Sequence, residues 1–93
     1  MPSTATAPSE MDILRRIVDA DESLSEDAAQ AILRLDFRAK DRARMNRLAA
    51  RNRDGKLTSR QEEELNSFIR VGQILGILQS KARRSLEFAD NQQ

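Results

Sequence analysis

The stretch that decides the fold is TSRQEEELNSFIRVGQILGIL, residues 58–78. Thr58, with Gln61 three residues later, forms the S/T-x-x-E/Q pattern of a helix-capping box, and three glutamates follow in the first turn. Apolar residues then recur at helical spacing from Leu65 onward, and basic residues follow at positions 81–84. The stretch therefore predicts a long helix that begins after Thr58.

Apolar side chains nearly encircle this predicted helix between Phe68 and Leu78. One side carries Leu65, Phe68, Ile69, Leu75 and Leu86, and the other carries Val71, Ile74, Ile77 and Leu78. A helix that is apolar on most sides needs cover on most sides, and either the rest of the chain or a second chain can supply it. Gly72 and Gly76, four residues apart, would suit the close approach of another helix from either source. We assign Val71, Ile74, Ile77 and Leu78 to a partner-binding surface.

Two short amphipathic helices are predicted in the N-terminal part of the chain. The first begins after Ser9, which is a good N-cap, and ends near Ala20. The second starts at Ser25, and its apolar residues fall on one stripe up to Leu35. Both have the pattern of ordinary helices that cover a core.

A third helix is predicted from about Arg38 to Arg53, where the glycine of Asp54-Gly55 ends it. Only about four residues separate it from the long helix, so the two should form an antiparallel hairpin. This hairpin would bring Arg51 and Arg53 near the glutamates that open the long helix.

Together these elements predict an all-α fold, a small bundle of about four helices that ends in an antiparallel hairpin with a long apolar C-terminal helix. Residues 9–88 would form a single helical domain between a disordered tail at 1–8 and a frayed tail at 89–93. With 93 residues the chain can bury only a modest core, so its own stability should be marginal.

The composition argues against an enzyme. The chain has no histidine, cysteine or tyrosine, which removes the commonest general base, the thiol nucleophile and most zinc sites. We therefore predict no catalytic residue, no metal and no cofactor. The lack of cysteine, the lack of a secretory pattern at residues 1–8 and the lack of a bilayer-spanning apolar run predict a cytoplasmic protein.

Charge is strongly segregated although the net charge is only +1. Residues 38–56 hold eight basic and two acidic residues, while the rest of the chain holds eight basic and thirteen acidic ones. Lys40, Arg44, Arg47 and Arg51 form one row along the third helix, because they are spaced by four, three and four residues. This basic row could bind phosphates or an acidic protein surface, or it could only face solvent and pair with nearby glutamates.

Residues 46–50 are similar to the N-x-x-A-A core of a basic-zipper DNA-contacting region, with Asn46, Ala49 and Ala50 in place. A basic zipper, however, continues without interruption into leucine heptads. Here Asp54-Gly55 breaks the helix and no leucine ladder follows in register, so the similarity stops at this segment.

A wider resemblance covers residues 24–86. The segments LDF at 35–37, DRARM at 41–45, GKLT at 55–58 and LQSKAR at 78–83 follow the pattern L-x-F, D-x-x-R-M, G-x-L-T and L-Q-S-K-A-R. This pattern resembles that of a group of short uncharacterised bacterial helical proteins whose genes often lie beside small nuclease genes, HNH-type among them. The resemblance implies an accessory or antitoxin-like partner and assigns no catalytic residue.

The leading hypothesis is therefore a non-catalytic protein-binding module, an antitoxin-like or accessory partner of a nuclease-type protein. It would bind through the basic row and the apolar residues of the long helix. The alternative is a DNA-binding transcriptional regulator that dimerises through the long helix and lays the third helix on the duplex. Simple self-association is a third possibility, and no membrane or small-molecule substrate is expected.

Overall fold

The computed structural model describes residues 7–20 and 23–91 and contains four helices and no strand within them. The helices are α1 (Glu10–Ala20), α2 (Glu26–Leu33), α3 (Ala39–Arg53) and α4 (Ser59–Asn91). The predicted all-α fold with four helices is confirmed. The predicted tail at residues 1–8 falls mostly outside the described residues, which here include only Ala7 and Pro8, and both are exposed.

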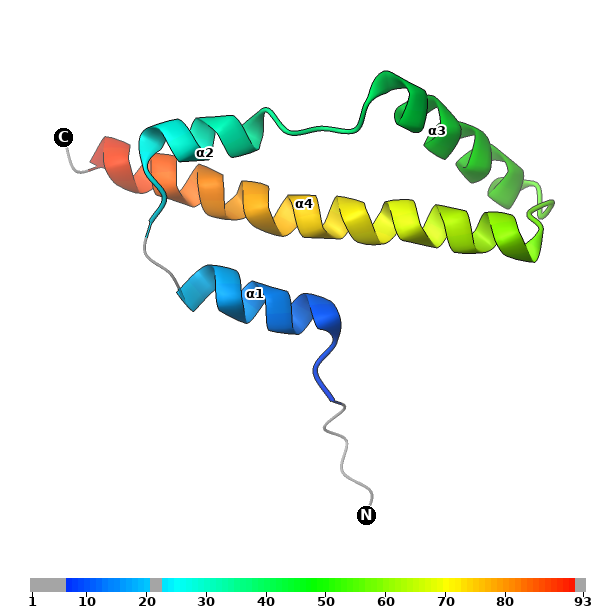
Figure 1. Ribbon diagram of the computed structural model, residues 1–93, viewed down its shortest axis with the longest axis horizontal. Coiled ribbons are helices and arrows are strands. Elements are labelled where there is room, and N and C mark those ends of the chain that lie inside the picture. The colour runs from blue at the N-terminus through cyan, green and yellow to red at the C-terminus, as the bar shows by residue number, and fades with distance from the viewer. Residues whose placement is uncertain (1–6, 21–22, 92–93) are drawn as a thin grey trace, which may run out of the picture.

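Helix α4 is the axis of the molecule. Each of the other three helices packs against α4, and these three do not pack against one another. Helices α2 and α3 lie along one side of α4, and α1 lies along the other (Figure 1). The molecule measures only 16 Å across its shortest axis, so the helices form a single layer. Both broad faces of α4 therefore lack a second layer of helices.

The helix starts follow the caps that the sequence indicates. The Thr58 amide donates to Gln61 Oε1 and the Gln61 amide donates to Thr58 Oγ1, each at 3.1 Å, so the capping box is confirmed. Ser9 and Asp12 exchange the same pair of bonds at 3.1 Å. At α2, the Ser25 hydroxyl accepts from the Ala28 amide at 3.2 Å.

The helix ends agree less closely with the sequence pattern. Gly55 has a φ of 69° and ends α3, as expected from its freedom to adopt the left-handed conformation. Helix α4, in contrast, continues through Asn91, three residues beyond the expected end at Phe88. The reason is that Glu87 to Asn91 contains no glycine or proline to stop the helix.

The hydrophobic core is small. The buried apolar residues among those described are Ala29, Leu48, Ile77 and Ala82, and Leu48 is the one large side chain that is fully buried. Ala29 of α2 and Ala82 of α4 are both completely covered, consistent with close approach of these two helices. No helix of the described chain is long and apolar enough to span a membrane.

Side chains of α4 also satisfy the ends of its neighbours. Gln79 Nε2 donates to the carbonyl oxygens of Ile32 and Leu35 at 3.2 and 2.8 Å, and so caps the C-terminal end of α2. Ser85 Oγ accepts from the Leu24 amide at 2.9 Å just before α2 begins. Lys81, which is buried, donates from Nζ to the Val18 carbonyl near the end of α1 at 2.9 Å.

Candidate functional site

The basic row on α3 is partly engaged within the chain. Arg44 binds Glu64 of α4 through two hydrogen bonds, Nε to Oε2 at 2.7 Å and Nη2 to Oε1 at 2.9 Å. The hydrogen bonds from the guanidinium hold the pKa of the Glu64 carboxyl below its ordinary value, and Arg60 and Arg47 add to the effect by charge. The same bonds raise the pKa of Arg44.

Arg51 and Arg53, which were expected near the glutamates, form no ion pair with them among the described residues, and Arg44 pairs with Glu64 instead. Because Arg44 faces Glu64 in an antiparallel pair, Arg51 lies opposite the loop, and its Nη2 donates to the Lys56 carbonyl at 3.5 Å. Lys40 and Arg47 are exposed and have no hydrogen bond or ion pair with any described residue. The row therefore keeps two cations that face solvent.

The partner-binding residues proposed on α4 separate into two groups. Val71, Ile74 and Leu78 line one apolar groove of about 230 Å³ between α4 and the segment that joins α2 to α3. Ile77 does not belong to this groove, because it is buried and lines a cleft on the α1 side. Ile77 lies at the edge of the stripe, about 60° from Ile74 but about 120° from Val71 around the helix, and this edge faces α1.

The other wall of the groove was not assigned from the sequence. Leu35, Asp36 and Phe37 supply it, and Leu75 completes the floor. The Phe37 ring packs edge-on against Phe68 with centroids 6.1 Å apart, which fixes the segment over α4. The L-x-F pattern at residues 35–37 was the sequence signal, but periodicity alone does not show which helix the loop will cover.

The apolar groove and the basic row lie on the same face of the molecule. Glu64, Val71 and Leu78 are seven residues apart, so they fall on one stripe of α4. Arg44 of the basic row pairs with Glu64, and the groove contains Val71 and Leu78. The basic row therefore flanks the end of the groove that is nearer the N-terminus of α4. We call this side the groove face.

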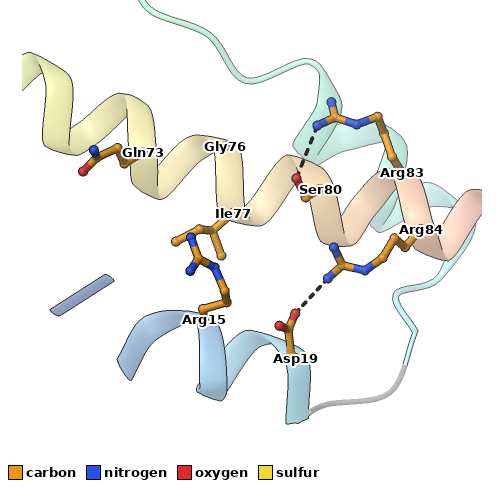
Figure 2. A pocket seen from close by; sticks show the side chains of 8 residues that line it. All are labelled: Arg15, Asp19, Gln73, Gly76, Ile77, Ser80, Arg83 and Arg84. Atoms are coloured by element: carbon orange, nitrogen blue, oxygen red, sulfur yellow. Dashed lines mark hydrogen bonds and ion pairs between the residues drawn. The ribbon is translucent and has the colours of Figure 1, made fainter. Parts of the chain in front are cut away.

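A second cleft opens on the opposite side of α4, between α4 and α1 (Figure 2). It is lined by Arg15, Asp19, Gln73, Gly76, Ile77, Ser80, Arg83 and Arg84. Arg84 pairs with Asp19 at 2.8 Å, and Arg83 Nη2 lies 3.4 Å from Ser80 Oγ. Ile74 and Leu78 are each two residues from Gly76, about 200° around the helix, so the cleft and the groove face opposite directions.

The two glycines of α4 do not pack against a helix of this chain. A Cβ on Gly72 would lie 3.9 Å from the Phe37 ring, an ordinary contact with a loop residue. A Cβ on Gly76 would meet nothing within 4 Å. Among the described residues, therefore, no helix packs closely against Gly72 or Gly76 as the sequence led us to expect.

No group of three or more histidine, cysteine, aspartate or glutamate side chains in the described part of the chain could hold a metal ion. Comparison of the sequence with protein families and characterised proteins, and of the fold with solved structures, found no match.

Proposed function

We propose that this chain is a non-catalytic protein-binding module that acts as an antitoxin-like or accessory partner of a nuclease-type protein. The observation that carries the proposal is the groove face, where an apolar groove lies beside a basic row. The resemblance of residues 24–86 to proteins encoded beside nuclease genes supports the choice of partner.

The groove fits a partner segment with apolar side chains at its centre. Leu35 and Val71 are both about half exposed, although they belong to the residue types most often buried in proteins. Covering such side chains gains roughly 25 cal/mol for each Å² of apolar surface removed from water. An exposed groove of this composition is therefore a suitable anchor site.

The basic row adds a preference for charge. Lys40 and Arg47 are exposed cations without a hydrogen bond or ion pair among the described residues, so an acidic flank on the binding segment would meet complementary charge. Such rim charges mainly raise the association rate and fix orientation. The partner segment should therefore combine apolar anchors with aspartate or glutamate at one end.

The test is co-expression of the chain with the product of its neighbouring gene, followed by affinity capture. Val71→Asp should abolish retention of the partner, because it places a charge in the groove. Ile69→Asp is the matched control, since Ile69 lies two residues away on the opposite side of α4 and is 48% exposed against 51% for Val71. Equal retention by both variants, or none by the wild type, would contradict the proposal.

The DNA-binding alternative gives a different result in the same set of experiments. A DNA binder should shift duplex DNA at low salt, lose affinity steeply as salt rises, and show a shallower salt slope once Lys40 and Arg47 are changed to Ala. A shift of that kind, together with no partner retention, would favour the regulator over the protein-binding module.

A further inference from the structure

We infer that a second copy of this chain covers the apolar groove by inserting Ile13 and Ile17 of its α1, and that the contact is reciprocal in a two-fold dimer. The inference uses the groove assigned above as a binding surface and so rests on that assignment. The second copy would occupy the groove when no other partner is bound.

The chain exposes enough surface to need such cover. Its accessible surface is 7414 Å², whereas a compact monomer of 10.5 kDa exposes about 5400 Å². A stable interface of standard size removes about 800 Å² from each partner. The difference of about 2000 Å², taken over the whole chain, is larger than this requirement.

The single-layer arrangement explains where the excess comes from. Stable domains bury their apolar helix faces between two or three packed layers. This chain places all four helices in one layer, so neither broad face is covered (Figure 1). Face-to-face packing of two copies would create the missing second layer without any other component.

Helix α1 carries the apolar ridge that such packing requires. It contains no buried residue, and two of its large apolar side chains, Ile13 and Ile17, are 46% and 65% exposed. The two isoleucines are four residues apart and so form one ridge. Ile17 is two residues from Arg15 and from Asp19, which line the cleft, so the ridge turns away from the cleft and toward the groove face.

A two-fold axis parallel to α4 makes the ridge and the groove meet. Helix α1 lies on one side of α4, and the segment that joins α2 to α3 lies on the other (Figure 1). Rotation by 180° about an axis parallel to α4 exchanges these two sides, and therefore places each α1 over the groove of the other copy. The interface is isologous, as in most homodimers.

The charges agree with this orientation. The N-terminal end of α1, with Glu10 and Asp12 in its first turn, points toward the end of the molecule where α3 lies (Figure 1). The same rotation preserves this direction along α4. The acidic turn, which lies level with Arg70 and Gln73 of α4, therefore approaches the Lys40 end of the basic row of the other copy, and Lys40 has no hydrogen bond or ion pair with a described residue.

This dimer would protect the groove until the proposed partner protein replaces the second copy. An exposed apolar surface of this kind is otherwise an aggregation hazard. The partner and the second copy would compete for the same groove, so binding of the partner should dissociate the dimer.

The first measurement is the molar mass in solution by light scattering. The wild type should have twice the chain mass of 10.5 kDa, and Ile17→Asp should weaken association by more than about tenfold. Because Ile17 is largely exposed, this variant should keep the helical content of the wild type. A monomeric wild type at submillimolar concentration would overturn the inference.

The second measurement locates the interface by cross-linking, which is clean because the chain contains no cysteine. A mixture of Ile13→Cys and Val71→Cys proteins should form a disulfide-linked pair under mild oxidation, because Ile13 lies between Met11 and Arg15, which line pockets with Arg70 and Gln73 and so place it level with the groove. A mixture of Ile13→Cys and Ile69→Cys proteins is the control and should cross-link much more slowly, because Ile69 lies on the other face. Equal rates in both mixtures, or a dimer that Ile17→Asp leaves intact, would overturn the inference.

The two proposals can fail separately. A monomeric chain that still retains the nuclease-type protein would remove the dimer and leave the binding function. A dimer cross-linked from Ile13 to Val71 that never retains the nuclease-type protein would support the dimer and remove the choice of partner.

Discussion

The two flanks of α4 are built in different ways. On the flank of α2 and α3, fully covered Ala29, Leu48 and Ala82 form the packed part of the core. On the flank of α1, polar contacts also hold the helix: Lys81 donates a hydrogen bond to the Val18 carbonyl, and Arg84 donates one to Asp19. The two exposed isoleucines of α1, Ile13 and Ile17, point away from α4.

The difference shows that a helix can belong to a fold without contributing much to its core. Burial of apolar side chains is the main source of stability, so the α2 and α3 flank should unfold only with the whole domain. Helix α1 has no buried residue and should open at a lower free energy. A helix held in this way keeps its apolar ridge available for another surface.

The largest expected effect comes from removing the main core side chain of the packed flank. Leu48→Ala should lower the free energy of unfolding by about 2–5 kcal/mol, because it leaves a cavity at a fully buried position. Ile17→Ala on the other flank should change it by no more than about 0.5 kcal/mol in the monomer. Urea denaturation of both variants at low protein concentration measures the two changes in the free energy of unfolding. Equal losses in the two variants would contradict the difference proposed between the flanks.

Lys81 should be the main attachment of α1. Lys81→Met keeps most of the buried aliphatic volume but removes the charged donor to the Val18 carbonyl, and hydrogen bonds of this type contribute about 1.5–3 kcal/mol. Amide hydrogen exchange should accelerate in α1 while α2 stays protected. Lys40→Met, at an exposed position on α3 away from α1, is the control and should leave exchange in α1 unchanged.

A substitution at Gly76 should stabilise the fold, in contrast to the two destabilising substitutions above. Gly76→Ala should raise the free energy of unfolding by about 1 kcal/mol, because a Cβ there meets nothing and alanine is the better helix former. Gly55→Ala should lower it, because Gly55 adopts a φ of 69° that alanine disfavours. Thermal unfolding of both variants gives the comparison. A destabilising Gly76→Ala would show that a neighbour approaches this position, contrary to the open surface seen here.

The sequence predicted the helices well because the signals that start and stop them are local. Ser25 and the pair of Thr58 and Gln61 cap helices within three or four residues, and Gly55 ends α3 by its own conformation. The contacts between helices were not predictable in the same way. Gln79 and Lys81 are ordinary polar residues in the sequence, yet they satisfy carbonyl groups 44 to 63 residues away.

The candidate site shows the same limit. The basic row and the apolar residues of α4 could be found from spacing, which places side chains on a stripe. Periodicity does not show which stripe the other helices cover, so Ile77 was grouped with Val71, Ile74 and Leu78 although α1 covers it. Leu35 and Phe37 reach the groove through an irregular segment whose path depends on tertiary packing.

The smallest expected effect concerns the pair of Arg44 and Glu64, which joins the basic row to the packed flank. Their side chains are 36% and 37% exposed, so solvent screening keeps the contribution small. The pKa of Glu64 is lowered in the folded chain, so the contribution is present above about pH 4.3, the ordinary pKa of a glutamate, and is lost as pH falls through the lower folded value. Glu64→Gln should therefore lower the melting temperature near neutral pH, and the difference from the wild type should vanish in acid. Glu63→Gln, at an exposed position without an ion pair among the described residues, should show no such convergence. A difference that persists unchanged at low pH would assign the effect of Glu64→Gln to packing and not to charge.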